Sequence, residues 1–96
     1  MPVYLVEYQP NDKNLKTEDY DDLIDELEDY EDCYHVVDNT WLICSDDLAD
    51  YVHKYLSKYI YEGDRILVTK VDDNYRGFLP ESAVNWLKKY VKCGSG

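Results

Sequence analysis

The side chains with the most obvious chemical potential in this sequence are carboxylates. One run holds ten of them with no Lys or Arg: Glu18, Asp19, Asp21, Asp22, Asp25, Glu26, Glu28, Asp29, Glu31 and Asp32. Apolar residues recur through this run at helical spacing, so its charges are expected on one solvated helix face. That face is either a solubility surface or a surface that presents carboxylates as DNA presents phosphates.

The second interpretation predicts a partner, namely a basic or nucleic-acid-binding protein whose groove receives the acidic helix. Like charges one turn apart on a helix destabilise it, which favours a functional reason for the run. The residues predicted to bind this partner are Glu18, Asp21, Asp22, Asp25, Glu26 and Asp29.

No other reactive side chains form a recognisable catalytic set. His35 falls in a strand-like segment and His53 in a helical one, and neither has Ser or Cys at the spacing of a nucleophile and its base. Asp46-Asp47 suits a helix N-terminus and Asp72-Asp73 a turn. We therefore expect no catalytic residue, no metal site and no cofactor.

The cysteines are odd in number and widely spaced, at Cys33, Cys44 and Cys93. This pattern fits neither a disulfide framework nor paired zinc ligands. Cys33 and Cys44 are expected to be small buried hydrophobic residues.

Length and composition limit the classes of protein to which this chain can belong. The chain has 96 residues, a formal charge of −11 and 45% hydrophobic residues, which predicts one folded domain rather than a disordered acidic tail. No window approaches the ~20 apolar residues of a membrane span, and the first residues lack a signal-peptide pattern, so we expect a cytoplasmic protein without membrane contact. The negative charge opposes direct binding to nucleic acid.

Local patterns predict the order of helices and strands. Residues 3–8, 33–37, 40–44 and 65–71 are rich in β-branched and aromatic residues and are predicted strands. Helices are predicted over residues 17–30, after Ser45 as far as Gly63, and from Pro80 onward. Asp38-Asn39 suits a tight hairpin turn, and residues 75–78 suit a short extended edge.

This order is the α+β plan β-α-β-β-α-β, a ferredoxin-like fold with an antiparallel four-stranded sheet, a C-terminal β-extension and a helix. Residues 1–92 are predicted to form the single domain, and residues 93–96 a flexible tail or a cloning scar.

The predicted strands carry apolar residues on both sheet faces, although two helices cover only one face. The other face must meet either the C-terminal helix or a second subunit. We favour a homodimer, and the residues predicted for its interface are Tyr4, Val6, Tyr8, Trp41 and Ile43.

Three segments also resemble a known family: residues 39–43, residues 63–68, and residues 75–80 with Ala83, Trp86 and Leu87. They look like the small bacterial SinR-like proteins related to the CRISPR-associated protein Cas2. The resemblance spans nearly the whole chain. It implies a ferredoxin-like fold, a homodimer built on the sheets, and kinship with metal-dependent nucleases.

The same resemblance implies a metal-binding aspartate at the end of the first strand, where this chain has Gln9. A neutral amide lacks the anionic oxygen that Mg²⁺ recruits. Glu7 should point to the opposite sheet face and Asp12 falls in a loop. We therefore expect a catalytically silent protein-interaction module, a phage or bacterial defence-related inhibitor that mimics nucleic-acid charge. The alternative is a Cas2-like metal-dependent nuclease.

Overall fold

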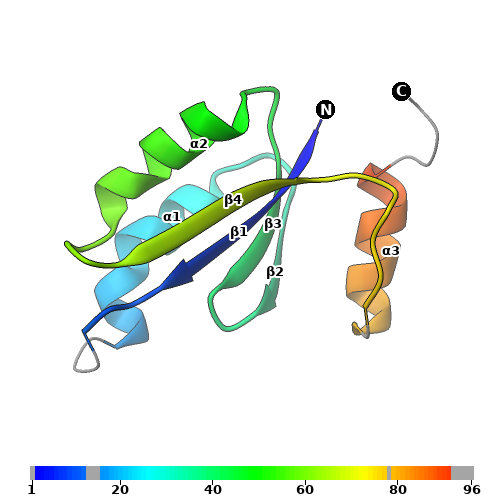
Figure 1. The fold of residues 1–96 in the computed structure, drawn as a ribbon. Coiled ribbons are helices and arrows are strands. Elements are labelled where there is room, and N and C mark those ends of the chain that lie inside the picture. Colours follow the sequence, from blue (N-terminus) through cyan, green and yellow to red (C-terminus); the bar gives the residue numbers. More distant parts are fainter. Residues whose placement is uncertain (1, 13–15, 78, 92–96) are drawn as a thin grey trace.

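Four antiparallel strands form one sheet in the order β2-β3-β1-β4 (Figure 1). The computed structural model describes residues 2–12, 16–77 and 79–91. The strands are β1 (Val3–Gln9), β2 (Cys33–Val37), β3 (Thr40–Cys44) and β4 (Arg65–Val71). The α-helices are α1 (Asp21–Glu28), α2 (Ala49–Leu56) and α3 (Glu81–Tyr90), with 3₁₀ turns η1 (Thr17–Tyr20) and η2 (Ser57–Tyr59). The predicted α+β, ferredoxin-like plan is confirmed.

Turn chemistry fixes the strand pairing. Asp38 has a φ of 38°, in the left-handed region that Asp tolerates, and it closes the β2–β3 hairpin. Gly63 has a φ of 86° in the turn before β4, and a Cβ there would lie 2.8 Å from the Asn11 side chain. Both turns therefore need the small or adaptable residues that occupy them.

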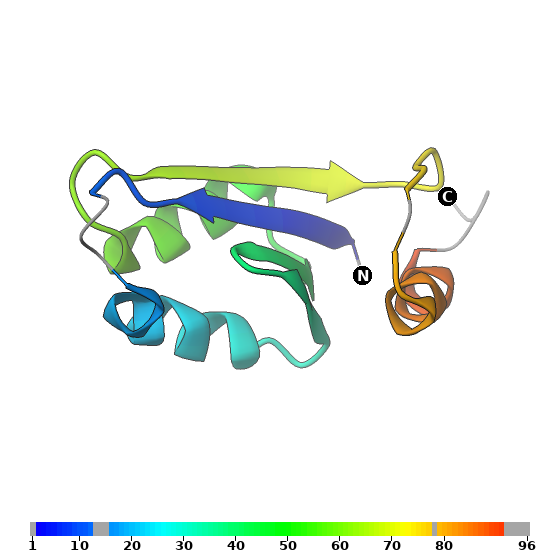
Figure 2. The same cartoon turned by 90° about the horizontal axis from the view of Figure 1, so that it is seen from below.

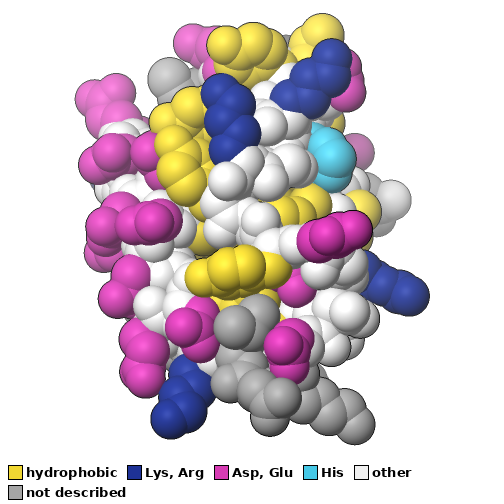
Figure 3. Space-filling view, turned by 90° about the vertical axis from the view of Figure 1, so that its left-hand side faces the viewer, with side chains coloured by type: hydrophobic (Ala, Val, Ile, Leu, Met, Phe, Trp, Pro, Cys, Tyr) yellow, Lys and Arg dark blue, Asp and Glu magenta, His cyan; other side chains and the backbone are white. Residues whose placement is uncertain are grey.

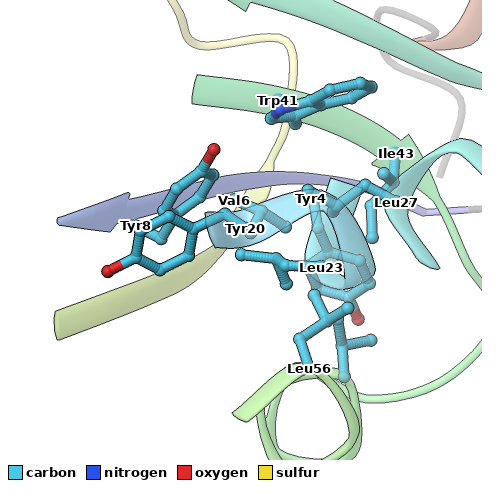
Figure 4. Close-up of a cluster of buried hydrophobic side chains, with 10 residues drawn as sticks. Tyr4, Val6, Tyr8, Tyr20, Leu23, Leu27, Trp41, Ile43 and Leu56 are labelled. Carbon is cyan, nitrogen blue, oxygen red and sulfur yellow. The ribbon is translucent and has the colours of Figure 1, made fainter. Parts of the chain in front are cut away.

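Helices α1 and α2 cover one face of the sheet (Figure 2). Figure 4 shows Tyr4, Val6, Tyr8, Trp41 and Ile43 on the strands, gathered with residues of α1 and α2 in one cluster. Each of these five strand residues is at most 4% exposed. They form the core of the domain, so a second copy cannot contact them, and their prediction as a dimer interface is wrong.

The helices begin later than predicted. Thr17–Tyr20 forms a 3₁₀ turn ahead of α1, and the Asp19 carboxylate accepts a hydrogen bond from the Lys16 backbone N–H at 2.6 Å. Ser45 does not cap α2, because its hydroxyl accepts from the Asp47 N–H in a turn that precedes the helix. Leu48 lies just before the helix and is 77% exposed.

The opposite sheet face is covered at one end only. Leu87 of α3 packs against Val3, Leu42 and Cys44, at the end of the sheet where β1 begins (Figures 1 and 2). Tyr90 donates a hydrogen bond to Asp32 at 2.6 Å and helps to hold α3 there. Cover by the C-terminal helix, the alternative to a dimer, is therefore present over part of this face.

Beyond α3, the same face is mainly polar. Glu7, Gln9 and Thr69 are exposed, and the Thr40 hydroxyl donates to Glu7. Leu67, an apolar residue on this part of the face, is 55% exposed. The predicted apolar residues of this second face, such as Val3, Leu42 and Cys44, thus gather at the end that α3 covers.

The predicted β-extension does not form in the described part of the chain: residues 74–77 are irregular, and Phe78 lies outside the described residues. The predicted tail at 93–96 also lies outside them. Among the described helices, none is long and apolar enough to cross a membrane.

Candidate interaction surface

The acidic run forms the outer surface of η1 and α1. Leu23 and Leu27 are fully buried against the sheet, so the opposite side of α1 faces outward. Glu18, Asp21, Asp22, Asp25 and Asp29 are exposed, and Glu26 is half-buried. Figure 3 shows acidic side chains gathered along the edge of the molecule formed by α1. The six residues predicted for the protein-binding face thus share one surface, here called the acidic face.

The acidic face is not neutralised by the described part of the chain. Between Lys16 and Lys54 the sequence has fourteen Asp or Glu residues and no Lys or Arg. Within the described residues, no Lys or Arg forms a salt bridge with the acidic face, whereas Lys54 pairs with Asp50 at 3.7 Å. Carboxylates one turn apart, such as Asp21 and Asp25, repel each other by a few tenths of a kcal/mol.

A groove lies between α1 and α2 beside the acidic face. Its volume is about 300 Å³, and its lining has equal numbers of carboxylates and tyrosines: Glu26, Asp29, Asp47, Tyr30, Tyr51 and Tyr55. Tyr51 is 62% exposed. This combination offers negative charge and aromatic ring faces to the same ligand.

Hydrogen bonds fix the walls of the groove. The Tyr55 hydroxyl donates to Glu26 at 2.7 Å, and this bond to a carboxylate, with Tyr59 beside it, raises the pKa of Tyr55. The Tyr4 hydroxyl donates to the Asp47 backbone carbonyl at 2.7 Å. Burial, with the nearby Asp47 and Glu26, raises the pKa of Tyr30. With their pKa raised, Tyr30 and Tyr55 stay neutral at physiological pH.

Asp64 anchors η1 to the turn before β4. It accepts hydrogen bonds from the Tyr20 hydroxyl at 2.7 Å, the Asn11 N–H at 2.8 Å and the Tyr61 N–H at 2.9 Å. Burial alone would raise the pKa of Asp64, but the three hydrogen bonds outweigh it and lower the pKa below its ordinary value. This carboxylate therefore helps to position the start of the acidic helix.

The other reactive side chains lie apart from the acidic face. His35 stacks on Trp41 with ring centroids 4.4 Å apart, and its Nε2 is hydrogen-bonded to the Asp38 carbonyl. Cys44 is buried as predicted, and burial with the nearby Asp32 raises its pKa to about 11, whereas Cys33 is half-buried.

The residues discussed for a metal site do not converge. Glu7 points away from the core, Gln9 is exposed at the end of β1, and Asp12 is exposed in the following loop. Among the described residues, no three His, Cys, Asp or Glu side chains are grouped to hold a metal ion.

The sequence prediction missed the groove. The sequence pattern indicated no site at Tyr30, Tyr51 or Tyr55, and it placed Asp47 at a helix N-terminus. The available signal was Tyr51 itself, an aromatic residue placed off the stripe of Val52 and Leu56.

Comparisons with known proteins place the chain in no family. No family model matches it, and no curated protein does. A solved structure, the leucine response regulatory protein LrpA of Mycobacterium tuberculosis, is 18% identical with a TM-score of 0.49. The alignment covers 82% of this chain and 57% of LrpA, so the chain spans less than two thirds of LrpA's length. The fold and surface define a small α+β protein of ferredoxin-like topology with an acidic face.

Proposed function

We propose that this protein is a catalytically silent interaction module whose acidic face binds a basic, nucleic-acid-binding protein. The observation that supports this most is that the segment between Lys16 and Lys54 holds fourteen Asp or Glu residues and no Lys or Arg, ten of them in the run from Glu18 to Asp32. Its members Asp21, Asp22 and Asp25 on α1 are exposed, and within the described residues they have no basic partner. A basic groove on a partner would turn their mutual repulsion into attraction.

The proposal extends to charge mimicry and to assembly. Exposed carboxylates along α1 would compete with phosphates for the same basic groove, as expected of an inhibitor in phage or bacterial defence. The resemblance to SinR-like and Cas2-like proteins stays a prediction. We also propose a homodimer, formed through the part of the opposite sheet face around Leu67 that α3 leaves exposed.

Affinity capture from a bacterial lysate tests the binding proposal. The test variant carries Asp21→Lys, Asp22→Lys and Asp25→Lys, and its matched control carries Asp46→Lys, Glu62→Lys and Glu81→Lys, six residues that are all exposed. Each reversal adds two charges, so both variants change from −11 to −5.

We expect the parent and the control to retain basic nucleic-acid-binding proteins, identified by mass spectrometry, and the α1 variant to lose them. Circular dichroism checks that all three proteins are folded. Equal capture by the α1 variant and the control would show that total charge, rather than the acidic face, governs binding, and the proposal would fail.

A further inference from the structure

The groove between α1 and α2 has a chemistry distinct from that of the outer acidic face. Outside it, the carboxylates of α1 are exposed to water, where ion pairs are weak. Inside it, three carboxylates stand next to three tyrosines in a volume of about 300 Å³, at the small end of the range for ligand sites. A cation in this groove would meet carboxylates and ring faces together.

Two exposed apolar residues lie near the groove. Leu48 is 77% exposed and Tyr51 is 62% exposed, three residues apart at the start of α2. Leu48 directly precedes α2 and directly follows Asp47, which lines the groove. Neither is needed by the core, which α2 contacts through Val52 and Leu56. Exposed aromatic and aliphatic residues next to a charged groove are typical of a protein interface.

We propose that this groove receives an arginine side chain of the basic partner, an inference that rests on the proposed function. A guanidinium is planar, stacks on aromatic rings and donates paired hydrogen bonds to carboxylates. Tyr51 supplies an exposed ring, and Asp29 and Asp47 supply carboxylates without a basic partner among the described residues. Leu48 and Tyr51 then pack against the apolar part of the partner segment.

The charge distribution favours a protein segment as the occupant. The groove continues into the acidic face through Glu26 and Asp29, which belong to both surfaces. A segment with one arginine in the groove and further basic residues along α1 would engage both at once, and its charge complements theirs.

The test uses a glycine-rich peptide with a single central arginine, and the same peptide with citrulline or lysine in its place. Citrulline keeps the shape of arginine and removes its charge. Binding is followed by NMR of the tyrosine ring signals in the full-length protein. We expect the arginine peptide to shift the signals of Tyr51 and Tyr55 saturably, the lysine peptide to bind more weakly, and the citrulline peptide not to bind.

Two groove variants and two matched controls localise the site. Tyr51→Leu and Asp47→Asn should each weaken arginine-peptide binding about threefold, as expected for loss of one exposed cation–π or charge contact. Tyr75→Leu and Asp46→Asn change an exposed tyrosine and an exposed aspartate outside the groove lining, and they should leave binding unchanged.

The outcomes separate this inference from the proposed function. If the arginine peptide shifts only amide signals of the outer acidic face, the groove inference is wrong while the acidic face remains a binding surface. Equal affinity for the lysine and arginine peptides would overturn the choice of guanidinium. If no peptide binds and the lysate capture also fails, both proposals are wrong.

Discussion

Removal of one hydroxyl should measurably loosen the start of the acidic helix. The Tyr20 ring is 2% exposed, and its hydroxyl donates to the Asp64 carboxylate at 2.7 Å. Tyr20→Phe keeps the ring, so it removes a hydrogen bond without opening a large cavity. Hydrogen bonds to charged groups contribute about 1.5–3 kcal/mol. Asp64 is half-buried and keeps two backbone donors, so we expect the lower end, about 1.5 kcal/mol.

Urea unfolding followed by circular dichroism measures this loss. In thermal unfolding, the same loss of unfolding free energy should lower the Tm of a domain of this size by about 6–12 °C. The matched control is Tyr61→Phe, which removes a hydroxyl that donates to the exposed Asp19 carbonyl at 3.0 Å, and it should change stability by less than about 0.5 kcal/mol. Equal effects of the two substitutions would refute the anchoring role of Asp64.

The pH dependence provides a second check on Asp64. Because its pKa in the folded protein is lower than in the unfolded chain, its contribution to stability is present above the unfolded value of about 3.9. That contribution is lost as the pH falls through the folded pKa. The stability difference between the parent and Asp64→Asn should therefore shrink on acidification. A difference that stays constant to low pH would contradict the lowered pKa.

Three further predictions concern assembly, thiol reactivity and catalysis. Light scattering should give a mass near twice 11.4 kDa, and Leu67→Lys should give the monomer mass; a parent that is monomeric at micromolar concentration would contradict the dimer. Cys44, with its pKa raised to about 11 by burial and by Asp32, should resist iodoacetamide at neutral pH until the protein is unfolded, as mass spectrometry can show. Mg²⁺ or Mn²⁺ should elicit no nuclease activity, and cleavage that Glu7→Ala or Asp12→Ala abolishes would overturn this.

The positions of the strands along the chain were predictable because each strand has a strong local sequence signal. Residues 33–37 and 40–44 are rich in β-branched and aromatic residues, and Asp38 at their turn adopts the left-handed conformation that its residue type allows. The faces of the strands were not predictable in the same way. Alternation separates two sets of residues, but when both sets contain apolar residues it does not say which set the helices cover.

Tyrosine caused part of this difficulty. Tyr4 is 3% exposed, yet its hydroxyl reaches the Asp47 carbonyl, so a residue with a polar tip can line the core. The groove was harder still to predict. It joins Glu26 and Tyr30 from one helix region to Asp47 and Tyr51 from another, and no local sequence pattern reports a contact between two helices.

The most direct test of the central claim is the affinity for polyarginine of the parent, the α1 charge-reversal variant and its matched control, measured across a salt series. At low salt we expect the control to bind nearly as well as the parent and the α1 variant to bind far more weakly. The difference in affinity between the control and the α1 variant should become smaller as salt shortens the Debye length below about 10 Å. Equal affinities of the two variants at every salt concentration would show that the acidic face is a solubility surface and would contradict the account.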